Sequence, residues 1–156
     1  PLGEDGEIRV RTPSLLKGYW NRPEATAEAL VDGWLRTGDI GLIDPDGFLH
    51  FLGRKKEMLK VKGMSVFPPE IEAVLGQHPA VLGSGVIGRT DPQRGEVPVA
   101  FVLLKPEADP ASTVQSLTDW CASRMAGYKL PEIRVVPSLP MTATGKVKKQ
   151  DLAALL

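Results

Sequence analysis

The sequence has 156 residues, enough for one domain or for one small domain and part of another. Its 19 basic and 19 acidic side chains give no formal net charge, which argues against general nucleic-acid binding. The longest apolar stretch, residues 97–104, is too short for a membrane span, and we expect no secretion signal. The single cysteine, Cys121, excludes an internal disulfide and a thiolate-rich metal site. We therefore expect a cytoplasmic protein with no metal site of its own.

Strands and turns dominate the first third of the chain. Residues 7–11 alternate charged and apolar side chains, which predicts a half-buried strand. A short helix is expected over residues 24–30, because a proline occupies its first turn. The sequence DPDG at residues 44–47 favours a tight turn, so a β-hairpin is predicted for residues 40–43 and 48–52.

Helices and strands are mixed in the rest of the chain. The pattern predicts, in order, a hairpin (58–61 and 65–67), a helix from residue 68, strands 81–88 and 97–104 joined by a polar turn, a helix (112–125), a strand (133–136) and a tail helix (148–156). These elements predict a small α+β domain with a central β-sheet flanked by helices.

The charge balance changes near residue 54. Residues 1–54 hold 6 basic and 9 acidic side chains, whereas residues 55–156 hold 13 and 10. The first segment is also too short and too rich in turns to bury a core alone. We therefore interpret residues 1–54 as the trailing β-rich segment of a larger N-terminal domain, and residues 55–156 as a separate C-terminal domain.

Four short clusters could carry chemistry. The carboxylate in residues 36–39 (RTGD) could accept hydrogen bonds from a diol such as a ribose, and the arginine in residues 53–57 (GRKKE) could hold a phosphate. Two lysines in residues 60–64 (KVKGM) share one face of the expected strand, where they could meet a polyanion. Taken singly, each of these three clusters is more often a solvated turn or a wet sheet face.

The fourth cluster, residues 139–146 (LPMTATGK), ends on a Gly-Lys pair. The spacing of a nucleoside-triphosphatase phosphate loop is absent, since residue 140 is proline and Val147 follows the lysine. A mobile loop that presents one ammonium group to developing negative charge fits the sequence, and a flexible basic loop is the simpler alternative.

Together and in this order, the clusters resemble the C-terminal third of the ANL superfamily of adenylate-forming enzymes, which includes acyl-CoA synthetases, firefly luciferase and peptide-synthetase adenylation domains. The resemblance covers nearly the whole chain. It rests on the G-E-I segment at residues 6–8 with G-Y-W at 18–20, on W-L-R-T-G-D at 34–39, on G-R at 53–54 with K-G at 62–63 and P-E-I-E at 69–72, and on L-P through G-K at 139–146.

The resemblance implies ATP-dependent activation of a carboxylate, followed by thioester formation with CoA. In the first half-reaction, Lys146 would bridge the carboxylate and the α-phosphate. For ATP or AMP it implies Asp39 on the ribose, Arg54 on ribose or phosphate, and Phe51 beside the nucleotide. In the second half-reaction, Lys60 and the Lys62-Gly63 turn would lie near the CoA thiol.

Lys56 matches the hinge about which the C-terminal domain of such enzymes rotates, and a lysine there favours CoA ligases or luciferase-like enzymes. Met64 stands where many aryl and acyl ligases have an aromatic residue, and residues 65–67 are most similar to bacterial medium- or long-chain fatty-acyl ligases. The phosphate loop, the acyl pocket and the expected Mg²⁺ site belong to an N-terminal domain that this sequence lacks, so we expect the chain alone to be inactive. A stand-alone, non-catalytic interaction module, a luciferase-like enzyme and a carrier-protein-linked adenylation domain are the alternatives.

Overall fold

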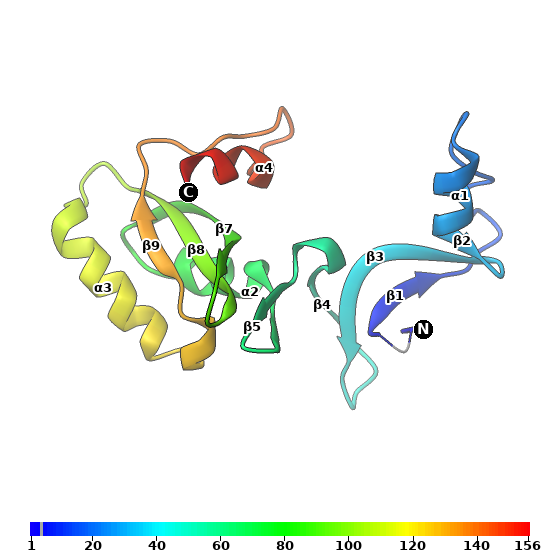
Figure 1. Ribbon diagram of the computed structural model, residues 1–156, viewed down its shortest axis with the longest axis horizontal. Helices are drawn as coiled ribbons and strands as arrows, with labels where there is room; N and C mark the ends of the chain where they lie inside the picture. Colours follow the sequence, from blue (N-terminus) through cyan, green and yellow to red (C-terminus); the bar gives the residue numbers. More distant parts are fainter. Residues whose placement is uncertain (4) are drawn as a thin grey trace. The chain divides into compact units, whose positions relative to one another are not determined.

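Two separate β-sheets organise the chain, one in each of two units, Pro1–Lys56 and Glu57–Leu156 (Figure 1). The structure is a computed structural model and describes residues 1–3 and 5–156. The two units are described separately below. Together they have the α+β character expected from the sequence.

The first unit is a small antiparallel sheet centred on its longest strand. That strand pairs with all three others, as the curved ribbon in Figure 1 shows. The elements of this unit are β1 (Glu7–Val10), α1 (Pro23–Ala29), β2 (Leu30–Val31), β3 (Trp34–Ile43) and β4 (Leu49–Arg54), followed by the 3-10 turn η1 (Lys55–Glu57) that leads into the second unit. The predicted hairpin is confirmed: Asp44 Oδ1 accepts hydrogen bonds from the backbone N–H groups of Asp46 and Phe48, at 3.0 and 2.9 Å.

The first unit buries very little apolar surface. Among its described residues, Ile40 is the one apolar side chain that is buried, at 8% exposure. The large apolar side chains that remain exposed are Val10, Tyr19, Trp20, Val31, Leu42, Ile43, Phe48, Leu49 and Phe51. An exposed apolar set of this size normally has a partner surface.

The second unit has a five-stranded mixed sheet with helices. Its elements are β5 (Leu59–Val61), β6 (Met64–Val66), α2 (Pro68–Gly76), β7 (Val81–Asp91), β8 (Gly95–Leu104), α3 (Pro110–Ala122), η2 (Gly127–Lys129), β9 (Glu132–Val135), α4 (Lys149–Leu152) and η3 (Ala153–Leu155). β8 pairs with β7 and β5 in antiparallel fashion and with β9 in parallel, so it is the central strand.

Strand β8 is buried on both faces, which explains its continuous apolar sequence. Ala100 and Val102 belong to the larger core, with residues of α2 and α3, whereas Val99 and Phe101 pack with Leu152 of α4. Successive side chains of a strand point to opposite faces. Helices α2 and α3 therefore cover one face of the sheet, and α4 covers the other (Figure 1).

Three boundaries differ from the sequence-based expectation. The strands on either side of residues 92–94 extend through the segment expected to be a polar turn, because cross-strand pairing continues to Asp91↔Gly95. Helix α3 begins at Pro110, where the Asp109 carboxylate accepts a hydrogen bond from Ser112 N at 2.9 Å and caps the helix. The tail is α-helical for one turn only and then continues as a 3-10 turn.

Candidate functional site

Asp39 and Arg54 lie directly opposite each other on β3 and β4. Arg54 Nε forms an ion pair with Asp39 Oδ1 at 2.8 Å, and this oxygen accepts no hydrogen bond from the described residues. The Asp39 side chain is 28% exposed and that of Arg54 is 53% exposed. The pair therefore offers a carboxylate that can accept hydrogen bonds from hydroxyl groups and a guanidinium that can bind a phosphate.

Residues 36–39 form part of β3 and not a surface turn between elements. Gly38 has a φ of 72°, a conformation that favours glycine, and this irregularity is accommodated inside the strand. Thr37 Oγ1 donates to Ile8 O at 2.7 Å and accepts from Asp39 N at 3.1 Å. The segment is thus fixed to β1, and Asp39 is held in place by the backbone that precedes it.

Glu7 is a buried anchor of this site that the sequence analysis did not single out as a site residue. Its side chain is 4% exposed, accepts a hydrogen bond from Gly38 N at 3.0 Å, and forms an ion pair with Arg36 at 3.1 Å. A buried carboxylate needs such partners. The signal in the sequence was an acidic residue in an otherwise half-buried strand, but its partners lie about 30 residues away in the chain.

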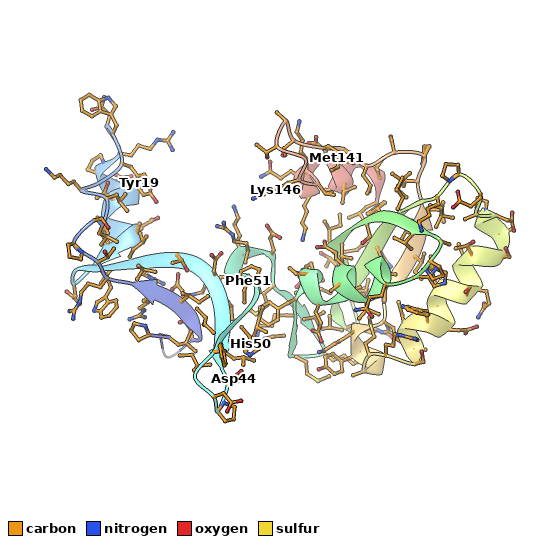
Figure 2. All side chains as sticks on the ribbon, turned by 180° about the vertical axis from the view of Figure 1, so that it is seen from behind. Tyr19, Asp44, His50, Phe51, Met141 and Lys146 are labelled. Carbon is orange, nitrogen blue, oxygen red and sulfur yellow. The ribbon has the colours of Figure 1, made fainter. Side chains whose placement is uncertain are left out.

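Phe51 lies on β4 and is 55% exposed. The Nε2 atom of its neighbour His50 is 2.6 Å from Asp44 Oδ2 at the end of the hairpin (Figure 2). The hydrogen bond with His50, with a second from Phe48 N, lowers the pKa of Asp44 below its ordinary value. We interpret the Asp44–His50 pair as a contact that stabilises the hairpin, since both residues belong to it.

Lys56 is exposed in η1 and is the last residue of the first unit. The preceding Lys55 forms an ion pair with Asp5 at 2.5 Å, which lowers the pKa of Asp5 to about 2. The segment that carries Lys56 is therefore tied back to the first unit through its neighbour.

Lys60 and Lys62 lie on a tight hairpin but do not share a strand face. Lys60 is in β5 and its Nζ donates to Ser65 Oγ across the hairpin at 2.9 Å. Lys62 falls after the end of β5, with a φ of 50°, and Gly63 has a φ of 80°. Two central residues with positive φ are the requirement of a type I′ hairpin turn, so Lys62 belongs to the turn. The prediction of one lysine-bearing face was wrong for that reason.

Lys146 is presented by a hydrogen-bonded hairpin turn. Met141 and Val147 form an antiparallel bridge, and Thr142 N donates to Lys146 O at 2.7 Å. Thr142 Oγ1 accepts from Lys146 N at 3.0 Å, and Gly145 supplies the positive φ that the turn needs, at 76°. The Lys146 side chain is exposed and has no ion-pair partner among the residues that the structure describes (Figure 2).

The sequence-predicted residues divide between the two units. Asp39, Phe51, Arg54 and Lys56 belong to the first, and Lys60, Lys62, Gly63 and Lys146 belong to the second. Within the first unit the structure brings Asp39 and Arg54 into contact. Across residues 1–3 and 5–156, no three His, Cys, Asp or Glu side chains gather as a metal site would require.

Comparison with known proteins decides the family. Residues 70–146 match the family described as AMP-binding enzyme C-terminal domain, and this match lies inside the second unit. The chain is the C-terminal portion of an adenylate-forming enzyme of the ANL superfamily. The resemblance drawn from the four sequence clusters is confirmed.

Relatives of the chain differ in what they act on. The chain is 46% identical to a 2-succinylbenzoate–CoA ligase of Geobacillus kaustophilus over 98% of its own length and 31% of that relative. It is 40% identical to a long-chain-fatty-acid–CoA ligase of Escherichia coli over 97% of its length and 27% of that relative. The solved structure of the amide bond synthetase McbA from Marinactinospora thermotolerans is 36% identical, with a TM-score of 0.88 over 100% of this chain and 32% of McbA. The chain thus spans less than a third of each.

In the described part of the chain, no helix has the length and apolar character needed to cross a bilayer.

Proposed function

We propose that the chain is the C-terminal part of an AMP-forming acyl-CoA synthetase, an acid–thiol ligase. In the first half-reaction, a carboxylate oxygen attacks the α-phosphorus of ATP and pyrophosphate leaves, which gives an acyl-adenylate. In the second, the CoA thiol attacks the acyl carbon, loses its proton, and displaces AMP. CoA ligases among the relatives at 40–46% identity support this reaction.

The observation that carries the proposal is the exposed Lys146 on its ordered turn. Charge develops between the carboxylate and the α-phosphate during adenylation, and a fixed ammonium lowers that barrier most when it needs no reorganisation. The hydrogen bonds between Thr142 and the Lys146 backbone hold the turn from which this ammonium group projects. We assign Lys146 as the catalytic lysine of adenylation.

In this proposal, residues of the first unit bind the nucleotide. The exposed part of the Asp39 carboxylate accepts the ribose hydroxyls, Arg54 binds ribose or phosphate, and Phe51 packs beside the nucleotide. Their support is the ion pair at 2.8 Å and the 55% exposure of the phenyl ring. For the second half-reaction we assign Lys60, Lys62 and Gly63 to the surroundings of the CoA thiol, and Lys56 to the hinge between the two half-reactions.

The remainder of the enzyme is the partner of the first unit. Nine large apolar side chains of that unit are exposed, and Ile40 is the one buried apolar side chain among its described residues. The N-terminal domain of the same polypeptide would cover them and supply the phosphate loop, the acyl pocket and Mg²⁺. A cytoplasmic location is proposed because the single cysteine, Cys121, is free and buried.

A fatty acid is the proposed acyl substrate, supported by two long-chain-fatty-acid–CoA ligases at 40% and 41% identity. The relatives also include 2-succinylbenzoate–CoA ligases and feruloyl-CoA synthases, so the acyl pocket upstream of this chain decides the choice. ATP–pyrophosphate exchange by the full-length enzyme, measured with medium-chain, long-chain and aromatic acids, tests it. The aromatic acids alone giving exchange would overturn the fatty-acyl assignment.

Two variants test the roles of the lysines in the full-length enzyme. Lys146→Ala is expected to abolish ATP–pyrophosphate exchange but to spare thioester formation from a supplied acyl-adenylate. Lys60→Ala is expected to impair thioester formation from the supplied acyl-adenylate but to spare ATP–pyrophosphate exchange. Equal loss of both half-reactions in each variant would refute the division of labour, and amide formation with an amine in place of thioester formation would refute CoA as the acceptor.

A further inference from the structure

A cluster of three charged side chains lies beside the Lys146 hairpin but is not part of it. Lys149 is the first residue of α4, three positions after Lys146. Its Nζ lies 3.0 Å from Glu57 Oε2 and 3.0 Å from Glu72 Oε1. The three side chains are between 22% and 32% exposed, so water screens them less than it screens a surface pair.

Both carboxylates are themselves fixed points of the second unit. Glu72 lies on α2, and its Oε1 also accepts a hydrogen bond from Val86 N of β7 at 2.8 Å. Glu57 is the first residue of the second unit and follows Lys56 directly. Lys149 thus joins the tail to the helix α2, to the sheet, and to the point where the second unit begins.

The rest of the tail is attached elsewhere. Leu152 is fully buried against the sheet, and Arg134 Nη1 donates to the carbonyl groups of Leu155 and Leu156 at 2.7 and 2.9 Å. On the other side of Lys146, Pro140 O accepts from Lys148 N at 2.8 Å. Leu139 and Val147 pack on the core at the base of the hairpin, and Lys149 adds ion pairs to Glu57 and Glu72 just after it.

We infer that Lys149 is a positioning residue for Lys146, a role that rests on the proposed function. Its ion pairs with Glu57 and Glu72 set the angle at which the hairpin leaves the sheet, and hence the direction of the Lys146 ammonium group. Without Lys149, two partly buried carboxylates lose their common cation, and their repulsion adds to the loss. A misplacement of about 1 Å at a reacting group costs about 100-fold in rate.

The test uses the full-length enzyme and compares the two half-reactions. Lys149→Met should lower kcat of ATP–pyrophosphate exchange by about 10- to 100-fold, with the KM for ATP unchanged because Asp39 and Arg54 lie in the first unit. Thioester formation from a supplied acyl-adenylate should stay within error of the wild type. Lys149→Arg, which keeps the charge and the donors, should recover most of the exchange.

Two further variants separate positioning from stability. Lys148→Met makes the same change at the next residue, whose ammonium has one exposed partner at 3.9 Å, and should leave both half-reactions unchanged. Glu57→Gln keeps the size of the side chain and removes one of the two negative charges around Lys149. It should therefore lower ATP–pyrophosphate exchange less than Lys149→Met does. This variant tests the inference independently if Lys149→Met folds poorly.

The inference is overturned if Lys149→Met and Glu57→Gln lower both half-reactions equally, or lower neither. A wild-type enzyme that shows no exchange with any carboxylate would overturn the proposed function, and this inference with it. An active enzyme in which Lys146→Ala abolishes exchange, but Lys149→Met does not reduce it, would overturn the inference alone.

Discussion

Leu152 is the apolar anchor of the tail, and its truncation to alanine tests how firmly the tail belongs to the second unit. The side chain is 0% exposed and packs with Val99 and Phe101 on the face of the sheet opposite α2 and α3. Leu152 also packs against Gly85 of β7. If residue 85 had a Cβ atom, that atom would lie 2.8 Å from Leu152 Cδ1, which is too close. The glycine at position 85 therefore provides the space that the Leu152 side chain occupies.

The expected cost follows from what Leu152→Ala removes. Three carbon atoms beyond Cβ leave a fully buried site, which costs about 2 kcal/mol in transfer free energy. The cavity that remains between the tail and the sheet raises the loss to about 3–5 kcal/mol of unfolding free energy. If the tail detaches before the sheet unfolds, the loss is limited to the free energy with which the tail docks.

Urea unfolding followed by amide hydrogen exchange in β7 and β8 is the suitable assay. Tryptophan fluorescence would mix the two units, because Trp20 and Trp34 lie in the first and Trp120 in the second. Leu155→Ala is the matched control. Leu155 is 47% exposed, so its truncation should change the unfolding free energy by no more than about 0.5 kcal/mol. Equal effects of the two truncations would refute the assignment of Leu152 as the anchor.

Two predictions concern pH. His78 is buried, its Nδ1 accepts from Ala80 N and its Nε2 contacts Ser116, and desolvation, with the charge of Arg124, lowers its pKa below the ordinary 6.5. The unfolded chain then binds a proton that the folded one does not, so the unfolding free energy should fall as the pH drops below about 6.5; His78→Gln should flatten this part of a urea-unfolding series, and parallel profiles would contradict it. For the Asp5–Lys55 pair, Lys55→Met should raise the pKa of Asp5 from about 2 towards its ordinary 3.8 in a carboxyl NMR titration, whereas an unchanged titration would show that Lys55 is not the cause.

Features that depend on neighbouring residues could be predicted from the sequence. The DPDG turn after β3 produced the expected hairpin, since Asp44 bonds to backbone groups within four residues of itself. The helix α2 begins at the expected Pro68, where a missing N–H costs nothing. The order of the four clusters was enough to identify the superfamily.

Features that depend on distant residues could not be predicted. The anchoring of Gly38 by Glu7 joins positions 31 residues apart, and the three-residue cluster around Lys149 joins the tail to Glu57 and Glu72. The hydrogen bonds that close the Lys146 turn were missed for a different reason. Small and hydroxylated residues are typical of flexible loops, but here Thr142 uses its hydroxyl to close the turn on the Lys146 backbone.

The first unit has paired strands but almost no buried apolar core, and these two features have different physical origins. The register of its strands is set by the β3–β4 hairpin turn and by the hydrogen bond that Glu7 accepts from Gly38, and neither contact needs an apolar core. Burial is what stabilises a sheet, however, and Ile40 supplies almost none of it. The second unit carries its own core on both faces of β8. The proposed N-terminal domain would supply that burial and so stabilise the Asp39–Arg54 pair, whereas the Lys146 hairpin packs on the core of the second unit itself.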